Sequence, residues 1–264
     1  MARGPSRFWL WTVPVTVGAL AAVVLGAGLV LALRGAAGDP IGDPAPPART
    51  AAPTPPPGGV RRVLVIGDSL ARGTGDESGR GFAGVVLEGM RRRGKTDLVN
   101  LGVNGMESPE IRSIAESANV RGLAANASLI LVSAGANDLS HAAARTGSTP
   151  AAMADAVATS RRDYAGNLRA ILTALRAANP NAPIGLIGLY DPFGGRAGPG
   201  TLGASVILQW NALAAETALS FPGVFVVPTF DLFQGREDRL SPDKYHPNKE
   251  GYELIGARVL QVAK

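Results

Sequence analysis

Short runs of consecutive apolar residues constrain this sequence more than any other feature. A strand exposed on one face alternates apolar and polar residues, whereas an unbroken apolar run is typical of a strand buried on both faces. Such strands belong to parallel sheets that are covered by helices on both sides. The predicted strands are Val63–Ile66, Asp97–Asn100, Ser128–Ser133, Ile184–Leu189 and Val224–Val227.

Helix-like stretches separate these runs. One helix is expected to open at Ser108-Pro109-Glu110, with serine as its cap and proline at its first helical position. The other predicted helices are Phe82–Arg93, Pro150–Ala178, Ala204–Leu219 and Lys249–Val262. The alternation predicts the α/β class, with a five-stranded parallel sheet and helices on both faces. In such sheets, function gathers in loops at the carboxyl ends of the strands.

The N-terminal part has a different composition. Phe8–Leu33 is a run of 26 residues without a charge, followed directly by Arg34. As a helix this run would be ~39 Å long, more than the ~30 Å of a bilayer's hydrocarbon core. We therefore expect residues 1–34 to form a short N-terminus and a transmembrane anchor. The alternative is a signal peptide cleaved near Ala36-Ala37.

Charge and composition predict the arrangement of the remaining parts. Arg3 and Arg7 precede the apolar run, which places the N-terminus in the cytoplasm and the rest of the chain outside. Residues 35–59 contain eight prolines and five glycines, typical of a stiff linker. A single folded domain is then expected over residues 60–264. The predicted location is the cell membrane, single-pass, with an extracytoplasmic domain, or a secreted form if the leader is cleaved.

Scarce residue types narrow the chemistry. The 264 residues include no cysteine and two histidines, so disulfides and a cysteine nucleophile are excluded. The basic pI near 10 favours nucleic-acid binding only if the charge forms a recognition surface. The triplet Arg91-Arg92-Arg93 instead falls at a predicted helix end, where cations complement the helix dipole. No nucleic-acid motif accompanies it, so we expect no nucleic-acid partner.

The first predicted strand runs into Gly67-Asp68-Ser69-Leu70. A serine at the carboxyl end of a buried strand presents its hydroxyl where substrates bind, and a nearby base would make it a nucleophile. The alternative is a helix N-cap, a common role of serine and aspartate at such a position.

Two further loops follow strands of the predicted sheet. Asn100-Leu-Gly-Val-Asn-Gly105 follows the second strand, and its glycines would let the backbone approach a ligand. Gly135-Ala136-Asn137-Asp138 follows the third, and the Asn137 amide could donate a hydrogen bond to an oxyanion. Ordinary turn chemistry explains either loop taken alone.

A candidate base lies near the C-terminus in Asp243-Lys244-Tyr245-His246. A carboxylate three residues before an imidazole can fix its tautomer and stabilise its protonated form. The alternative is a surface loop with a capping aspartate. The other histidine, His141, is expected to be an exposed residue of a loop or of a helix start.

Together these four blocks, in this order, resemble the SGNH or GDSL family of esterases and lipases, in particular its lysophospholipase-L1-like branch. The resemblance covers residues 60–264 and implies a three-layer α/β/α fold of the flavodoxin type. It implies Ser69 as nucleophile, His246 as general base and acid, and Asp243 as its orienting carboxylate. The implied oxyanion-hole donors are the Ser69 N–H, the Gly105 N–H with Gly102 as its rival, and the Asn137 amide.

The resemblance implies an ester substrate and no metal or other cofactor. Asp68 and Asp138 are expected to hold loops rather than to react, and Tyr190 and Phe193 either line a substrate pocket or belong to the core. The predicted function is therefore a membrane-anchored serine esterase that acts through an acyl-enzyme. An O-acyltransferase on cell-envelope glycans and a non-catalytic binding module of the same fold are the alternatives. No feature of the sequence indicates an oligomeric state.

Overall fold

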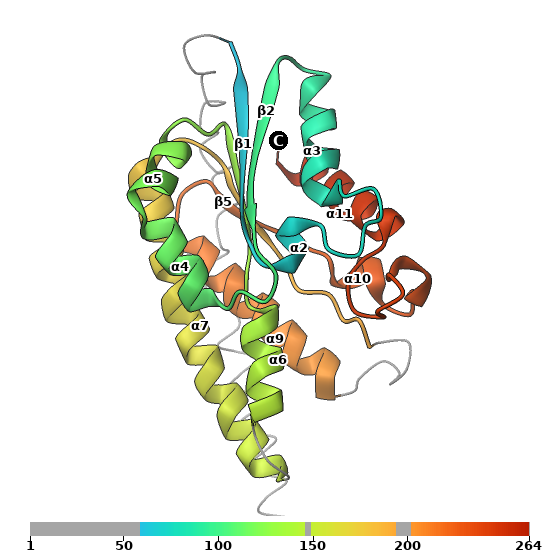
Figure 1. The fold of residues 1–264 in the computed structure, drawn as a ribbon. Helices are drawn as coiled ribbons and strands as arrows, with labels where there is room; N and C mark the ends of the chain where they lie inside the picture. Colours follow the sequence, from blue (N-terminus) through green and yellow to red (C-terminus); the bar gives the residue numbers. More distant parts are fainter. Residues whose placement is uncertain (1–58, 146–148, 194–201, 264) are drawn as a thin grey trace, which may run out of the picture. The chain divides into compact units, whose positions relative to one another are not determined.

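The computed structural model describes residues 59–145, 149–193 and 202–263 (Figure 1). The predicted membrane anchor and all but the last residue of the predicted linker lie outside the described residues, as does part of the loop after the fourth strand. Within the described part of the chain, no helix combines the length and the apolar character needed to cross a bilayer.

The sheet has the predicted five parallel strands. Their order across the sheet is β2-β1-β3-β4-β5, which is the order of flavodoxin-like folds. The chain leaves β1 toward one edge and later returns to β3 on the other side, so the space above β1 and β3 is the switch point where such folds bind ligands. The strands are β1 (Arg61–Gly67), β2 (Thr96–Gly102), β3 (Leu129–Ser133), β4 (Ile184–Ile187) and β5 (Val224–Val227).

Helices cover both faces of the sheet, as Figure 1 shows, and confirm the predicted three layers. One face carries α3 (Gly81–Arg91) and α11 (Lys249–Val262). The opposite face carries α4 (Ser108–Glu116), α5 (Ala118–Ala125), α7 (Pro150–Ala178) and α9 (Leu202–Leu219). Short elements at the sheet's carboxyl edge and beyond it are α2 (Ser69–Arg72), α6 (Ala136–Arg145), α10 (Phe230–Phe233) and the 3-10 helix Glu237–Arg239.

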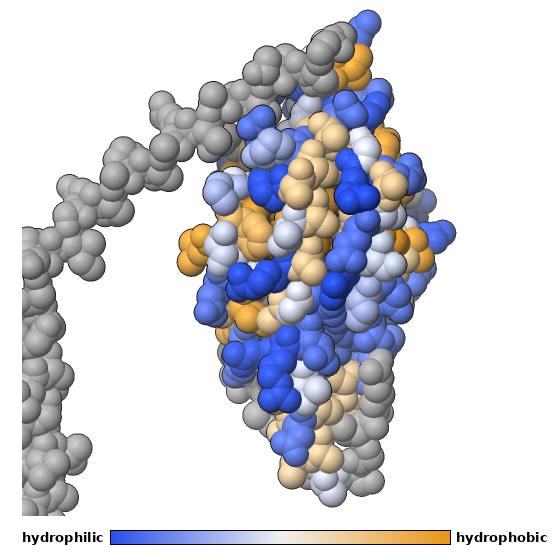
Figure 2. Space-filling model, turned by 90° about the vertical axis from the view of Figure 1, so that its left-hand side faces the viewer, coloured by the Kyte–Doolittle hydropathy of each residue, from blue (hydrophilic) through white to orange (hydrophobic). Residues whose placement is uncertain are grey.

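Side chains of β1 explain why the apolar runs are unbroken. Leu64 and Ile66 point into the core beneath α4 and α7, whereas Val63 and Val65 point into the core beneath α3 and α11. All four are fully buried, so each position of Val63–Ile66 requires an apolar side chain. Figure 2 shows the outer side of the α4, α5 and α7 layer, where hydrophilic side chains are interspersed with smaller hydrophobic ones.

Three local predictions were wrong. Helix α4 is capped by Glu107 rather than Ser108, because the Glu107 N–H donates to the Glu110 carboxylate while Ser108 turns toward the next loop. Residues 136–145 form helix α6, which is absent from the predicted helices, although His141 was expected in a loop or at a helix start. Strand β4 ends at Ile187, two residues early, because the side-chain amide of Asn211 takes both backbone hydrogen bonds of Leu189.

Candidate active site

Ser69 opens helix α2 directly after β1. The chain turns at Gly67, where a Cβ would lie 2.2 Å from the Ser133 carbonyl oxygen, so a larger residue does not fit. The buried Asp68 carboxylate accepts hydrogen bonds from the Leu70 N–H (3.0 Å) and the Ser133 hydroxyl (2.7 Å). Burial raises the pKa of Asp68, although these hydrogen bonds oppose the shift. Asp68 therefore holds the turn, as predicted, and it rather than Ser69 is the N-cap.

The loop before α11 wraps around one carboxylate. Asp243 Oδ1 accepts the N–H groups of Tyr245 and His246, both at 2.9 Å, and the Ser241 hydroxyl at 2.6 Å. Lys244 makes this possible with a φ of 57°, in the left-handed region that non-glycine residues seldom adopt. The turn thus fixes the other carboxylate oxygen toward the imidazole of His246.

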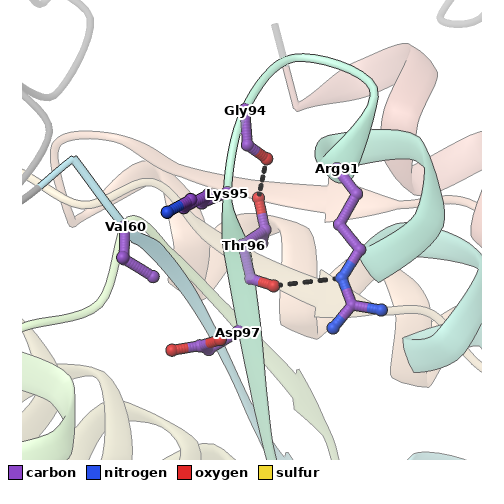
Figure 3. A pocket seen from close by; sticks show the side chains of 6 residues that line it. All are labelled: Val60, Arg91, Gly94, Lys95, Thr96 and Asp97. Carbon is purple, nitrogen blue, oxygen red and sulfur yellow. Dashed lines mark hydrogen bonds between the residues drawn. The ribbon is translucent and has the colours of Figure 1, made fainter.

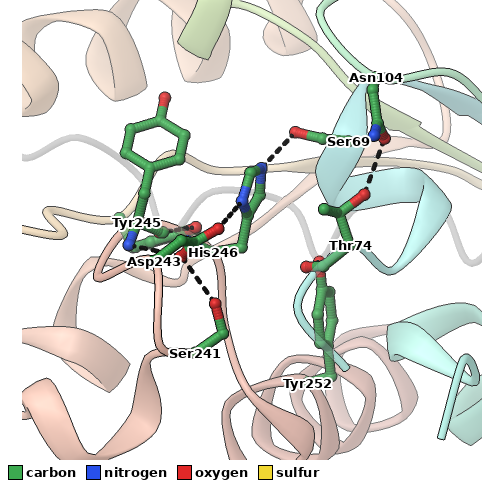
Figure 4. Close-up of polar contacts among 9 residues, drawn as sticks. Ser69, Thr74, Asn104, Ser241, Asp243, Tyr245, His246 and Tyr252 are labelled. Atoms are coloured by element: carbon green, nitrogen blue, oxygen red, sulfur yellow. Dashed lines mark hydrogen bonds and ion pairs between the residues drawn. The ribbon is translucent and has the colours of Figure 1, made fainter. Parts of the chain in front are cut away.

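The structure brings the three predicted residues together in a chain of side-chain contacts (Figure 4). His246 Nδ1 lies 2.6 Å from Asp243 Oδ2, and His246 Nε2 lies 2.9 Å from Ser69 Oγ. With a proton on Nδ1 donated to the carboxylate, Nε2 is left to accept the proton of the hydroxyl. Ser69 is 9% exposed and the His246 side chain 18%, so both are within reach of solvent.

Asp243 is held in its ionised form. Burial alone would raise its pKa, but hydrogen bonds from Ser241, His246 and two backbone N–H groups outweigh it and hold the pKa well below the usual value. A permanent negative charge beside Nδ1 stabilises the imidazolium that forms when Nε2 takes up a proton.

Gly102 and Gly105 have different surroundings. A Cβ on Gly102 would lie 2.3 Å from the Arg72 backbone nitrogen, and the Gly102 N–H already donates to Asn100 Oδ1 at 2.9 Å. Gly105 has a φ of 79°, and a Cβ there would meet no atom within 4 Å. Gly102 is thus needed for packing against α2, which favours Gly105 as the backbone donor.

Asn137 lies in the first turn of α6, above the carboxyl end of β3. Its Nδ2 donates to the Met106 carbonyl at 2.8 Å, which engages one of its two amide hydrogens. In the sheet register Gly67 pairs with both Gly102 and Ser133, so the loops after β1, β2 and β3 begin at one level. The three predicted oxyanion donors therefore lie on adjacent loops of one sheet edge.

Two more residues of helix α6 bind the start of α4. Asp138 accepts the Ser108 N–H at 2.9 Å and the Ser108 hydroxyl, which confirms its predicted loop-holding role. Burial raises the pKa of Asp138. His141 Nδ1 lies 2.7 Å from Glu107 Oε1, with 46% of the side chain exposed. Asp138 and His141 share the spacing of the pair near the C-terminus, but Asp138 faces Ser108 instead of the imidazole.

Aromatic residues flank the imidazole of His246. The Tyr190 hydroxyl donates to the Tyr245 carbonyl at 2.8 Å, and its ring centre lies 4.3 Å from that of Phe233. Tyr190 therefore supports the loop that carries Asp243 and His246. Phe193 is 49% exposed, with its ring 6.3 Å from that of Tyr245, which in turn lies edge-on to His246 at 5.0 Å. A pocket role for Tyr190 and Phe193 stays a prediction.

Some residues of the site had no signal in the sequence. The Thr74 N–H donates to the Ser69 carbonyl at 3.0 Å, and its hydroxyl donates to Asn104 Oδ1 at 2.7 Å. Its own carbonyl accepts the Tyr252 hydroxyl at 2.7 Å (Figure 4). Thr74 thus links the backbone of Ser69 to Asn104 and Tyr252, and the Ser241 hydroxyl holds the Asp243 carboxylate. Only the three-dimensional structure reveals them, because their partners lie on other elements or in an irregular turn.

Gly75 gives a direct test of the loop's position. A Cβ there would lie 2.8 Å from His246 Cβ and 2.5 Å from the Pro247 carbonyl oxygen. Because displacements of about 1 Å can cost about 100-fold in rate, Gly75→Ala should lower kcat on a chromogenic ester tenfold or more. Gly79→Ala, in the same loop and also at positive φ but facing open space, is the control. Equal kcat values for the two variants would contradict the prediction.

Within the described residues, no three His, Asp or Glu side chains are grouped so that they could hold a metal ion. The arrangement of Ser69, His246 and Asp243 at the carboxyl edge of a parallel sheet is instead that of the serine-hydrolase class. Comparison with known families identifies the chain more closely. Residues 65–254 match the model of the GDSL-like lipase/acylhydrolase family, so the chain belongs to that family and is a carboxylic ester hydrolase.

Individual proteins are similar to this chain in sequence or in fold. The chain is 27% identical over 208 residues to the uncharacterized protein YpmR of Bacillus subtilis (strain 168), which covers 76% of this chain and 81% of YpmR. The fold is similar to that of the lipase Lip_vut3 from a goat rumen metagenome, with a TM-score of 0.67, 23% identity and coverage of 77% and 97%. It is also similar to a family 3 carbohydrate esterase of Clostridium thermocellum, with a TM-score of 0.56, 18% identity and coverage of 77% and 97%.

Proposed function

We propose that this chain is a serine esterase that hydrolyses acyl esters through a covalent acyl-enzyme, with its catalytic domain outside the cytoplasm. Ser69 is the nucleophile, His246 the general base and acid, and Asp243 the orienting carboxylate. The observation that carries this proposal is the continuous path from Ser69 Oγ through His246 to Asp243, with separations of 2.9 and 2.6 Å.

The chemistry follows from the proton positions. His246 Nε2 takes the hydroxyl proton as Ser69 Oγ attacks the ester carbonyl, and Asp243 stabilises the resulting imidazolium. The tetrahedral intermediate then collapses, and the alcohol leaves with the proton from Nε2. Water, deprotonated by the same nitrogen, attacks the acyl-enzyme, releases the acid and restores the serine. The N–H groups of Ser69 and Gly105 and the Asn137 amide stabilise the developing oxyanion.

Replacing Asn137 by alanine tests the oxyanion hole. Losing one donor typically lowers kcat by about 10²- to 10³-fold. We expect this loss in kcat with a nearly unchanged KM, because the donor acts on charge that develops in the transition state. Asn167→Ala, which removes an amide that donates to Ser108 at the same α4 junction, is the control for loosened packing. If both variants lose equal activity, Asn137 is only structural.

The activity itself is tested with residues 50–264, which form one compact unit. A series of chromogenic esters from short to long acyl chains measures hydrolysis, and a fluorophosphonate probe labels an activated serine. Acetylated sugars belong in the series, because proteins of similar fold include an acetylxylan esterase as well as a lipase. If no ester is hydrolysed and no probe is bound, the proposal is wrong.

The proposed location rests on the uncharged run Phe8–Leu33 and on the arginines before it. Its length suits a bilayer span, and Arg3 and Arg7 favour a cytoplasmic N-terminus. Cell fractionation should recover the full chain with membranes, where protease added from outside degrades the domain. Recovery in the medium, with a new N-terminus near residue 37, would replace the anchored form by a secreted one.

A further inference from the structure

Basic residues gather at the sheet edge opposite the active site. This cluster, called the basic edge here, consists of Arg61, Arg62, Arg91, Arg92, Arg93 and Lys95. Figure 1 shows the amino ends of β1 and β2 at one end of the domain and α2, which carries the nucleophile, by the opposite ends of these strands. The two edges are separated by the length of β1, about 20 Å for seven residues.

The fold itself builds the basic edge. Arg61 pairs with Thr96 in the sheet register and donates its N–H to the Lys95 carbonyl at 2.9 Å. Residues 91–95, which include the last residue of α3 and the turn after it, are exposed. A hollow of about 490 Å³ opens among Val60, Arg91, Gly94, Lys95, Thr96 and Asp97 (Figure 3).

The charges of the basic edge are not neutralised by the domain. Within the described residues, arginines elsewhere pair with carboxylates, as Arg112 does with Glu116 and Arg258 with Asp231. In that same part of the chain, no residue of the basic edge takes part in such an ion pair. Arg91 donates to the Thr96 carbonyl, and Asp97 is the single acidic residue of the hollow. A surface with six cations, none of them in an ion pair within the described residues, favours an external anion.

The position of the N-terminal segment indicates which anion binds the basic edge. The 58 residues that precede the described domain join it at Gly59 and Val60, beside Lys95 in the hollow. That preceding segment contains the uncharged run Phe8–Leu33. We infer that the basic edge binds the anionic phospholipid surface next to the anchor, so that Ser69 faces away from the membrane. The choice of occupant rests on the proposed membrane attachment, not on the proposed chemistry.

This orientation narrows the substrate class. An active site on the far side of the domain meets esters carried by water-soluble or wall-borne molecules before it meets lipids of the bilayer beneath. The charges around the active site agree with this orientation. Acidic residues such as Glu107 and Asp243 lie at that edge and would be repelled by an anionic surface.

Vesicle binding tests the inference. Residues 50–264, which contain the whole sheet and both hydrophobic cores, are mixed with vesicles of phosphatidylcholine alone or with about 30 mol% phosphatidylglycerol. Wild type should sediment with the anionic vesicles only and be released at about 0.5 M NaCl. Because each cation near such a surface contributes about fivefold, the triple variant Arg92→Gln/Arg93→Gln/Lys95→Gln should bind between ten- and about a hundredfold more weakly.

The matched control removes the same charge elsewhere. Arg161→Gln/Arg162→Gln/Arg169→Gln alters three exposed arginines of α7 and should bind vesicles within about twofold of wild type. Equal weakening by both triple variants, or no binding of wild type to anionic vesicles, would overturn the inference. So would tighter binding to duplex DNA than to vesicles at equal charge.

Activity on the vesicles separates this inference from the proposed chemistry. Vesicle-bound wild type should hydrolyse a soluble chromogenic ester at its free rate and release no fatty acid from phosphatidylglycerol. Fatty-acid release would contradict the orientation while supporting the esterase. Ser69→Ala should bind the vesicles as wild type does. A wild type that binds the vesicles but hydrolyses no ester would overturn only the proposed chemistry.

Discussion

Ser69→Ala is expected to lower kcat/KM on acyl esters by about 10⁴- to 10⁶-fold while leaving the fold intact. The hydroxyl is the group that His246 Nε2 contacts at 2.9 Å, and it is the atom that the base activates for attack on the ester carbonyl. The variant should also lose all labelling by a fluorophosphonate probe. Loss of labelling identifies the nucleophile, whereas loss of activity alone would not.

The control for this substitution is Ser113→Ala, an exposed serine on α4 that loses the same hydroxyl. It should keep full activity and full labelling, and both variants should unfold at the temperature of wild type within a few degrees. If Ser69→Ala retains labelling, the probe reacts at another residue and the assignment of Ser69 is wrong.

Asp243→Asn is expected to lower kcat about 10⁴-fold with the loop still in place. The amide oxygen can take the position of Oδ1 and keep the bonds from Ser241 and the backbone. Its NH₂ group would then face His246 Nδ1 and force the tautomer that carries its proton on Nε2. Such an imidazole cannot accept the Ser69 proton. Steady-state kinetics should show the loss, and an Asp155→Asn variant, altered at an exposed position of α7, should not.

The same variant tests the low pKa of Asp243. A carboxyl whose pKa is lower in the folded than in the unfolded chain stabilises the fold at any pH above its unfolded value. That contribution is lost as the pH falls below about 4 and through the native pKa. The unfolding temperature of wild type should therefore exceed that of Asp243→Asn near neutral pH, and the gap should close in acid. A gap that persists in acid would mean that packing, not charge, causes it.

The architecture was predictable because burial on both faces leaves a direct trace in the sequence. Each side of β1 meets a helix layer, so Val63–Ile66 has no polar position, and the same holds for Leu129–Val132 of β3. Helix α6 was missed because its first turn, Ala136-Asn137-Asp138, has the composition of a loop. What makes it helical is tertiary: Asp138 and Asn137 bond to the segment before α4, and no local pattern encodes that partner.

The reacting residues could be predicted because chemistry restricts their types. A chain with two histidines and no cysteine leaves few candidates for a base. Because Asp138 and His141 have the same spacing as Asp243 and His246, the choice of His246 came from the resemblance of its block to the family. Gly75 and Thr74 could not be predicted, because their importance lies in contacts with segments more than 25 positions away. A glycine or threonine in a loop is ordinary until its neighbours are known.

The long separation between Ser69 and His246, 177 positions along the chain, sets the order in which activity can appear during synthesis. The strand that carries the nucleophile is made early, but its base is supplied by the loop just before α11, which packs against α3. A nascent chain therefore has no esterase activity until helix α11 has packed against α3. Ester cleavage therefore reports completed folding of the domain.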